Sequence, residues 1–320
     1  MLMRRFAVPI SSVSLVLLAA GAAPGQNYPS KPIRIVAAAP GGVGDFSARL
    51  IAQGLTGSLG QPVVIENRPN GFIQYETVAV ASPDGYTLLV TGNNLWIGPL
   101  LGRVPYDPVK SFSPITILTL SPLLLVVSPS LLVKSVKDLI TLAKAKPGEL
   151  NYASTGSGSP SHLAAELFKS MAGINMLYVP YKGITQGLND LIAGRVQVMF
   201  PIADAAIPHV KSGTLIALAV TSVRPFSLEP GVPTMDASGL PGYEAAAILC
   251  MFAPAKTPVT IVNRLYLVLG RFLKAPEIEE KFLNAGIETV GSSPEELKVT
   301  MNLEMTNMGK VIRDAGIKAE

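Results

Sequence analysis

The sequence predicts an α/β protein with two lobes, each built on a doubly wound sheet. Short apolar runs of strand length alternate with helical segments on short connections, a pattern typical of doubly wound parallel sheets. Strands buried on both faces have continuous apolar sequences, as residues 123–127, 215–220 and 247–252 do. About 300 residues remain after an N-terminal leader, which is enough for two domains of ordinary size.

The first 23 residues have the features of a secretory signal peptide. Arg4 and Arg5 supply positive charge, residues 13–20 form an apolar run, and small residues at 20–22 fit an A-x-A cleavage pattern. The apolar run is shorter than the about 20 residues that a membrane-spanning helix needs, and no cysteine follows it to carry a lipid. We predict cleavage at residues 22–23 and a periplasmic location; a retained membrane anchor is the alternative.

In the first half of the chain, glycine and proline mark the ends of the predicted elements. The apolar strand at 33–37 breaks at Pro40, and a helix with apolar residues on one side follows from near Asp45. Two further strands are predicted at 62–65 and 86–90, the second directly after a Pro-Asp-Gly turn.

The second half repeats this alternation. Helices are predicted at 135–145, 160–171 and 184–193. Ser135 and Ser159 are the expected N-caps of the first two helices, and a glycine follows the third. Strands are predicted at 151–154, 176–180, 196–200, 215–220 and 247–252, and two or three helices complete the chain.

The apolar runs at 123–127 and 247–252 are interpreted as the strands that cross between the lobes. This interpretation places residues 24–127 and 250–320 in one lobe. Residues 128–249 form the other lobe. Because both crossings are strands, we expect no flexible linker between the lobes.

Composition argues against several classes of function. Apolar residues make up 48% of the chain and charged residues 15%, the proportions of a protein with a large core. The net charge is only +4 and no basic run occurs, so we expect no nucleic-acid partner. Cys250 is the single cysteine, and His162 and His209 are the two histidines. We therefore expect no disulfide, no metal site and no other cofactor.

Two glycine-rich loops are the main candidates for a binding site. Each follows a strand and leads into a helix N-terminus, where free N–H groups favour an anion, and glycine lets the backbone approach a ligand. Ligands of open α/β sheets lie outside the carboxyl ends of the strands, where both loops fall. With one carboxylate beyond the strand at 196–200, the predicted ligand-binding residues are Ala38, Ala39, Pro40, Gly41, Gly42, Asp45, Ser154, Thr155, Gly156, Ser157, Gly158, Ser159, His162 and Asp204.

Three of these side chains have a second interpretation. Asp45 is also a candidate N-cap of the helix that it begins. His162 could instead pack or form hydrogen bonds locally in the first turn of its helix. Asp204 could be solvated or cap a helix.

Common catalytic and nucleotide-binding patterns are absent. The second loop is not G-x-S-x-G because Gly158 stands at the serine position. Neither loop is G-x-G-x-x-G because Ser47 and Ser161 replace the third glycine, and no P-loop pattern occurs. We predict a protein that is not an enzyme. The alternative, an exported hydrolase using Ser157 or Ser159, lacks a matching histidine–aspartate pair.

Short ordered motifs occur along the whole chain. They include Tyr28-Pro29-Ser30-Lys31-Pro32, Glu66-Asn67-Arg68-Pro69, Pro83-Asp84-Gly85-Tyr86, Val179-Pro180-Tyr181-Lys182-Gly183 and Gly239-Leu240-Pro241-Gly242-Tyr243. Together they resemble the substrate-binding receptors of tripartite tricarboxylate transporters, the Bug receptor family. The resemblance implies a type II periplasmic-binding-protein fold whose lobes close on a small carboxylate held by backbone amides and waters. It also implies a monomer that delivers this ligand to the membrane permease subunits of a tripartite transporter.

The sequence departs from the family pattern around the expected pocket. The first loop of the family reads P-F-P-P-G-G, and here Ala37, Ala38 and Ala39 replace the first Pro, the Phe and the next Pro. The loss of that Phe removes an aromatic wall, and Phe72 is a candidate to refill the space. Pro201 also stands where the family commonly carries an Asp. Together these departures suggest an altered pocket, more apolar than that of a receptor for acidic amino acids, or a member of the family that has drifted. An orphan ligand sensor of the same fold, with a regulatory partner, is the alternative function.

Overall fold

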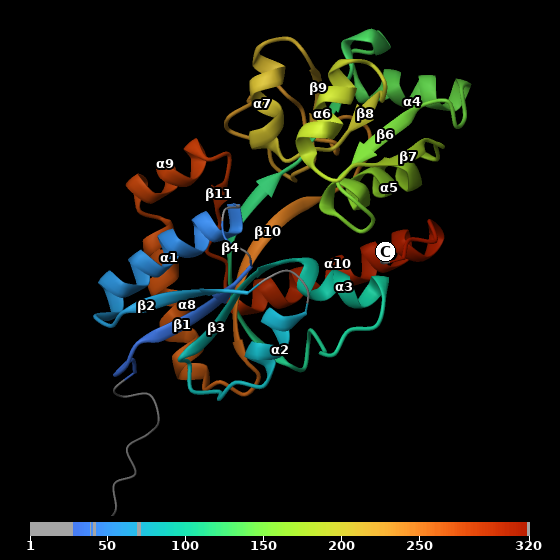
Figure 1. Ribbon diagram of the computed structural model, residues 1–320. Coiled ribbons are helices and arrows are strands. Elements are labelled where there is room, and N and C mark those ends of the chain that lie inside the picture. Colours follow the sequence, from blue (N-terminus) through green and yellow to red (C-terminus); the bar gives the residue numbers. More distant parts are fainter. Residues whose placement is uncertain (1–27, 39, 41–42, 69–71, 319–320) are drawn as a thin grey trace, which may run out of the picture.

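The computed structural model describes residues 28–38, 40, 43–68 and 72–318, which form two lobes around two sheets. Figure 1 shows one lobe above the other, with β4 (Phe112–Pro122) and β10 (Ala246–Pro254) rising from the lower lobe toward the upper one. This two-lobed α/β architecture confirms the predicted fold class. The predicted signal peptide lies outside the described residues.

The lower lobe contains a six-stranded sheet of order β11-β4-β10-β3-β1-β2. Its other strands are β1 (Ile33–Ala37), β2 (Val63–Asn67), β3 (Thr87–Gly92) and β11 (Glu288–Thr289). β1 is parallel to β2 and β3, whereas β10 is antiparallel to both β3 and β4. The sheet is therefore mixed rather than wholly parallel as expected, because β10 enters from the other lobe and runs against β3.

Helices cover both faces of this sheet. One face packs against α1 (Val43–Leu59), α8 (Val259–Leu273) and α9 (Pro276–Asn284), and the other against α2 (Ile73–Ala79), α3 (Asn94–Leu101) and α10 (Pro294–Asp314). Successive residues of one strand enter different cores: Ile35 faces the first set of helices and Val36 the second. Burial on both faces explains the continuous apolar sequence of these strands.

The upper lobe contains a five-stranded sheet of order β7-β6-β8-β5-β9. Its elements are β5 (Leu124–Val127), a 3-10 turn (Pro129–Leu131), α4 (Val136–Ala145), β6 (Asn151–Ser154), α5 (Pro160–Ala172), β7 (Leu177–Pro180), α6 (Ile184–Ile192), β8 (Val198–Met199), α7 (Ala203–Lys211) and β9 (Ile216–Val220). Both predicted N-caps are confirmed, since Ser135 Oγ accepts from the N–H of Asp138 and Ser159 Oγ from that of His162.

The chain passes between the lobes twice, close to the predicted points but not at them. The first passage lies between β4 and β5, at Leu123, and the second precedes β10. The expected boundaries at residues 127 and 249 fall later, because β5 already belongs to the upper sheet and β10 pairs with β4 from Ala246 onward.

Thr221, which follows β9 and is fully buried, binds both passages. Its N–H and its hydroxyl both donate to the carbonyl oxygen of Leu123, each at a distance of 3.0 Å. Its Oγ1 also accepts from the N–H of Leu123 at 2.9 Å. The carbonyl oxygen of Thr221 accepts from the N–H of Ala245 at 3.1 Å. One residue therefore joins the two segments that connect the lobes.

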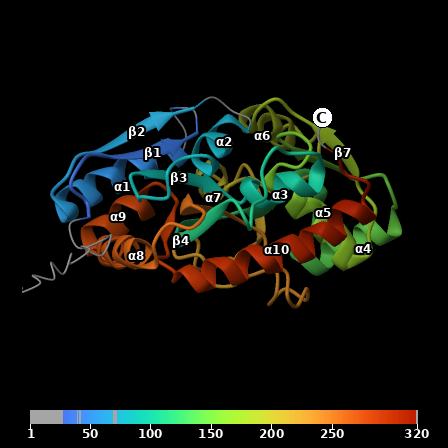
Figure 2. The same cartoon turned by 90° about the horizontal axis from the view of Figure 1, so that it is seen from below.

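Helix α10 also connects the lobes. It begins with a capping box between Ser293 and Glu296, then packs against β4 and α3 below and α5 above. Seen from below in Figure 2, this helix runs lengthwise across the molecule, past β4, α3 and α5. Midway along it, Glu304 Oε2 accepts hydrogen bonds from Trp96 Nε1 (2.9 Å) and Asn93 Nδ2 (3.3 Å). Burial, with a smaller effect of the Glu244 carboxylate, raises the pKa of Glu304 to about 7 despite these bonds.

We predict that Glu304→Gln removes part of the pH dependence of stability. The native state keeps a proton on Glu304 up to about pH 7, whereas an unfolded glutamate with the ordinary pKa of 4.5 has already lost it. The contribution of Glu304 to stability is therefore full below about pH 4.5 and lost as the pH rises through 7. At alkaline pH the free energy of unfolding of the variant should exceed that of the native protein by roughly 1–3 kcal/mol. Urea unfolding on both sides of this pH window measures the difference. Glu295→Gln, at an exposed position of the same helix, is the control and should lose stability with rising pH as the native protein does. The same loss of stability in Glu304→Gln would refute the prediction.

Candidate functional site

The two glycine-rich loops occupy equivalent places in the two lobes. One connects β1 to α1 and the other β6 to α5, so each lies at the carboxyl end of a strand and at a helix N-terminus. The second loop is fully described, whereas Ala39, Gly41 and Gly42 of the first lie outside the described residues. Both loops therefore stand where the sequence placed them, and their role in binding stays a prediction.

Side chains from α1 and β2 hold the first loop. Asn67, the last residue of β2, donates from Nδ2 to the carbonyl oxygen of Ala38 at 2.6 Å and to Asp45 Oδ1 at 2.8 Å. Arg49 donates from Nε to Asp45 Oδ2 and from Nη2 to Asn67 Oδ1. Because α1 already begins at Val43, Asp45 lies in its first turn and is not its N-cap. The buried carboxylate of Asp45 thus holds Asn67, and through Asn67 the carbonyl of Ala38 in the loop.

The second loop depends on two glycines with positive φ. Gly156 has φ +111° and Gly158 has φ +74°, values that side-chain-bearing residues rarely adopt. Ser159 caps α5, and Pro160 occupies its first turn, as the sequence predicted. Thr155 is exposed, and Ser157 Oγ donates to the carbonyl oxygen of Lys318 at 2.9 Å.

The second loop touches the lower lobe at α3. A Cβ atom on Gly158 would lie 2.4 Å from Cδ1 of Leu101, so a larger residue here would require the Leu101 side chain to shift. The loop of the upper lobe therefore lies directly against a helix of the lower one.

A cavity of about 530 Å³ lies beside the first loop and this contact. Leu101, which meets Gly158, lines it together with Ala38 of the first loop. Its described lining carries no charged residue and otherwise comprises Gly44, Phe72, Gln74, Tyr75, Val90, Thr91, Gly92, Asn94, Gly98 and Leu249. Oε1 of Gln74 is buried without a hydrogen-bond partner among the described residues. The cavity is thus mostly apolar, with a few neutral polar groups.

Asp204 lines a different groove between the lobes. This groove has a volume of about 760 Å³, and Asp45, Phe46, Lys211 and residues 283–287 also line it. Asp204 lies in the first turn of α7, where its Oδ1 lies 2.7 Å from the N–H of Ala205. Gly286 of the lower lobe lies so close that a Cβ there would be 2.6 Å from the Cβ of Asp204. The structure therefore separates Asp204 from the cavity at Ala38.

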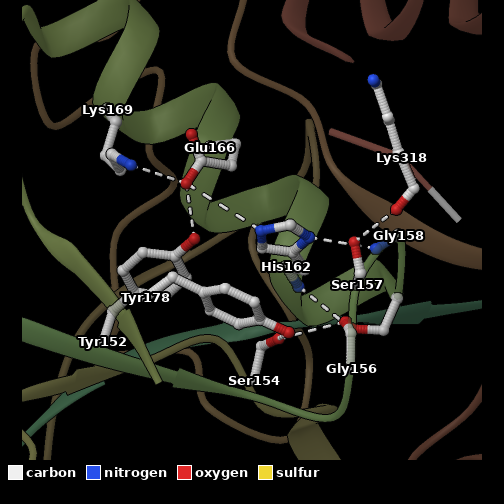
Figure 3. A network of polar contacts seen from close by, with 11 residues as sticks. Tyr152, Ser154, Gly156, Ser157, Gly158, His162, Glu166, Lys169, Tyr178 and Lys318 are labelled. Carbon is white, nitrogen blue, oxygen red and sulfur yellow. Dashed lines mark hydrogen bonds and ion pairs between the residues drawn. The ribbon is translucent and has the colours of Figure 1, made fainter. Parts of the chain in front are cut away.

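His162 lies beneath the second loop with only 4% of its surface exposed. Its Nδ1 accepts a hydrogen bond from the N–H of Gly158 at 3.0 Å, and its ring stacks on Tyr178 (Figure 3). These local contacts match the second interpretation of this residue, and it lines neither the cavity at Ala38 nor the groove at Asp204.

Several residues at the site were not predicted from the sequence. Asn67 belongs to a motif shared with the family, which was a usable signal, but Arg49, Gln74 and Leu101 belong to no motif quoted above. These residues act through contacts with segments that are distant in the sequence, and no local sequence pattern indicates such contacts.

Metal and membrane features were searched within the described part of the chain. No group of three or more His, Cys, Asp or Glu residues there is arranged to hold a metal ion. No helix in that part is both long enough and apolar enough to cross a bilayer. Cys250 is fully buried, and burial raises the pKa of its thiol, so it packs as a small hydrophobic core residue.

Two α/β lobes joined by two passages, with a glycine-rich loop from each lobe near the junction, define a periplasmic binding protein. Two solved structures from Rhodopseudomonas palustris support this class. Rpa4515 with adipate is 36% identical, with a TM-score of 0.75 over 92% of this chain and 100% of that chain. MatC with bound malate is 28% identical, with a TM-score of 0.71 over 89% and 100%.

The chain belongs to the tripartite tricarboxylate transporter family of receptors, whose family model matches residues 47–317. BugT of Bordetella pertussis is 34% identical over 92% of both chains. A UPF0065 protein from the tcbD-tcbE intergenic region of Pseudomonas sp. strain P51 is 34% identical over 91% of this chain and 88% of its own length. These comparisons confirm the family resemblance, and the family is one of periplasmic solute receptors rather than enzymes.

Proposed function

We propose that this protein binds a small carboxylate between its lobes in the periplasm and delivers it, as a monomer, to the membrane subunits of a tripartite transporter. Family membership supports the receptor role. Relatives solved with adipate and with malate support a carboxylate ligand. The observation that carries the proposal is the meeting of the lobes at Gly158 and Leu101, since Leu101 also lines the cavity beside Ala38.

The carboxylate would bind backbone N–H groups of the first loop, beside Ala38, and those of Thr155, Gly156 and Ser157 in the second loop, at the N-termini of α1 and α5. Helix N-termini bind anions through free N–H groups and the helix dipole. A hydrogen bond to a charged group contributes about 1.5–3 kcal/mol. Three or four such bonds would supply much of the roughly 8 kcal/mol of a micromolar site.

The rest of the ligand would occupy the cavity beside Ala38. Phe72, Tyr75 and Leu249 offer apolar surface there, and the carboxamide of Gln74 offers a neutral polar contact. An acid with an apolar body and one uncharged polar group fits this lining. Asp204, in the neighbouring groove, would meet only a ligand long enough to extend beyond the cavity.

Gly156→Val should weaken carboxylate binding about tenfold or more while leaving the fold intact, because valine cannot keep φ near +111°. A thermal-shift screen of mono-, di- and tricarboxylates and aromatic acids identifies the probe, and calorimetry measures its affinity. Gly213→Val is the matched control: this glycine also has a positive φ, +72°, and open space around it, but lies in the turn after α7. Unchanged binding by Gly156→Val would place the carboxylate elsewhere.

Ala38→Phe should weaken binding of the same acid by about 1 kcal/mol or more, the usual effect of overfilling a site. A phenylalanine buries about 150–250 Å², and Phe72 already occupies part of the same cavity. Ala38→Ser, which adds little volume, should bind like the native protein. Unchanged or tighter binding by Ala38→Phe would mean that the alanine has no bearing on ligand size.

Residues 1–23 should be removed on export, leaving a soluble periplasmic protein. The two arginines and the short apolar run of the leader are the basis for this expectation. Mass spectrometry of the periplasmic fraction would then find an N-terminus at residues 23–24. An intact leader on a membrane-bound chain would contradict it.

A further inference from the structure

A cluster of stacked rings and hydrogen-bonded charges lies beneath the second glycine loop. It comprises Tyr152 of β6, Tyr178 of β7, and His162, Glu166 and Lys169 of α5, and we call it the imidazole cluster (Figure 3). The ring centroids of His162 and Tyr178 are 4.3 Å apart, and those of Tyr178 and Tyr152 are 5.4 Å apart. The cluster is buried, with Tyr152, His162 and Glu166 exposing 0%, 4% and 6% of their surfaces.

The contact with Gly158 defines the protonation of the imidazole. A backbone N–H can only donate, so the Nδ1 atom of His162, 3.0 Å from the nitrogen of Gly158, must accept. A neutral ring that accepts at Nδ1 carries its proton on Nε2. Nε2 faces Oε1 of Glu166 at 4.0 Å, and this negative charge favours a proton there.

The far end of the cluster fixes Glu166. Its Oε1 accepts from the hydroxyl of Tyr152 at 2.5 Å and from Nζ of Lys169 at 2.6 Å. Burial, and next the hydrogen bond to Glu166, raise the pKa of Tyr152 well above its usual range, so its hydroxyl remains a donor. Lys169 balances the charge of the buried carboxylate, which would otherwise be costly.

The loop needs such an anchor because its glycines do not fix its conformation. Gly156 and Gly158 both have positive φ, and glycine has more backbone freedom to lose than any other residue. The bond to His162 uses the N–H of Gly158, and Leu101 of α3 packs against the same glycine. The N–H groups of Thr155, Gly156 and Ser157 are then presented by a loop held from below.

We propose that His162 is a positioning residue for this loop: the neutral imidazole holds Gly158, and a second proton on the ring releases it. An imidazolium has N–H donors at both nitrogens, so its Nδ1 would face the N–H of Gly158 donor to donor, while Nε2 would gain attraction to Glu166. The titratable groups that the described contacts place around the ring are Glu166 and Lys169 of α5, Tyr152 of β6 and Tyr178 of β7. The proposal rests on the proposed function only where it names the loop as ligand-binding.

Nitrogen-15 NMR of the ligand-free protein tests the tautomer directly. The chain has two histidines, and His209→Gln assigns the spectrum. At about pH 7.5 we expect His162 with Nδ1 unprotonated and Nε2 protonated, and an N–H of Gly158 protected from hydrogen exchange. Acidification until the spectrum itself reports a proton on both nitrogens should lower that protection about fivefold or more. A proton on Nδ1 at the higher pH, or protection that does not change when the ring is charged, would overturn the proposal.

Two amide substitutions separate positioning from simple packing. In His162→Asn, Oδ1 can take the place of Nδ1 as an acceptor that does not titrate, whereas in His162→Gln the amide reaches the position of Nε2 instead. We expect His162→Asn to keep the protection of Gly158 within about threefold and to lose its pH dependence, and His162→Gln to lose about tenfold at both pH values. Equal protection in the two variants would overturn the proposal, and the titration of the native protein decides it if either variant fails to fold.

Calorimetry with adipate and benzoate at about pH 7.5 links the loop to binding. His162→Gln should bind whichever acid the native protein binds about tenfold more weakly, and His162→Asn within about threefold. Full binding by His162→Gln would overturn the positioning role. If neither acid binds the native protein, the proposed function fails for these acids, while the tautomer and exchange measurements still decide the role of His162.

Discussion

The hydrogen bonds of Thr221 to both interlobe segments are the constraint on which the rest of the fold depends. Its backbone and hydroxyl satisfy the N–H and carbonyl of Leu123, and its carbonyl binds Ala245. Leu123 and Thr221 lie next to the paired residues Leu124 and Val220, so their bonds extend the pairing of β5 with β9 into the first passage. By fixing both passages at one point, Thr221 determines how the carboxyl ends of β1 and β6 approach each other. The relative position of the two glycine-rich loops therefore depends on this junction.

Helix α10 adds a third connection that does not pass through the sheets. Glu304 links it to Trp96 of α3 and to Asn93 just before that helix, and its surface packs on α5. The carbonyl of Lys318, beyond its end, accepts a hydrogen bond from Ser157 in the second loop. The second loop is therefore held by its own lobe and by the C-terminal segment of the other. Any rotation of the lobes that separates Gly158 from Leu101 must also disturb these C-terminal contacts.

The sequence predicted those features that are determined by neighbouring residues, and not those that depend on contacts between distant segments. β1 and β6 were predicted to the residue, and the N-caps Ser135 and Ser159 were correct, because apolar runs, glycines and caps act within a few residues. Three of the missed elements, β4, α3 and α7, contain Pro114, Pro99 and Pro208, which oppose regular structure locally and are overruled by tertiary packing. In the same way, Gly156 and Gly158 could be recognised from the pattern, but the contact with Leu101 and the network of Asn67, Asp45 and Arg49 could not. Those contacts join segments that only the folded sheet brings together.

The two loops are held by different chemistry, and this difference bears on how a ligand would leave. Asn67 and Arg49 fix the first loop through a carboxamide, a guanidinium and the carboxylate of Asp45, with no imidazole among these contacts. The second loop depends on the Nδ1 lone pair of His162. On the positioning proposal, a fall in pH would therefore loosen the upper loop first and leave the lower one in place. If these loops bind a carboxylate as proposed, half of that site would then open while the lobes remain joined at Thr221, so proton-driven release would not require the lobes to separate.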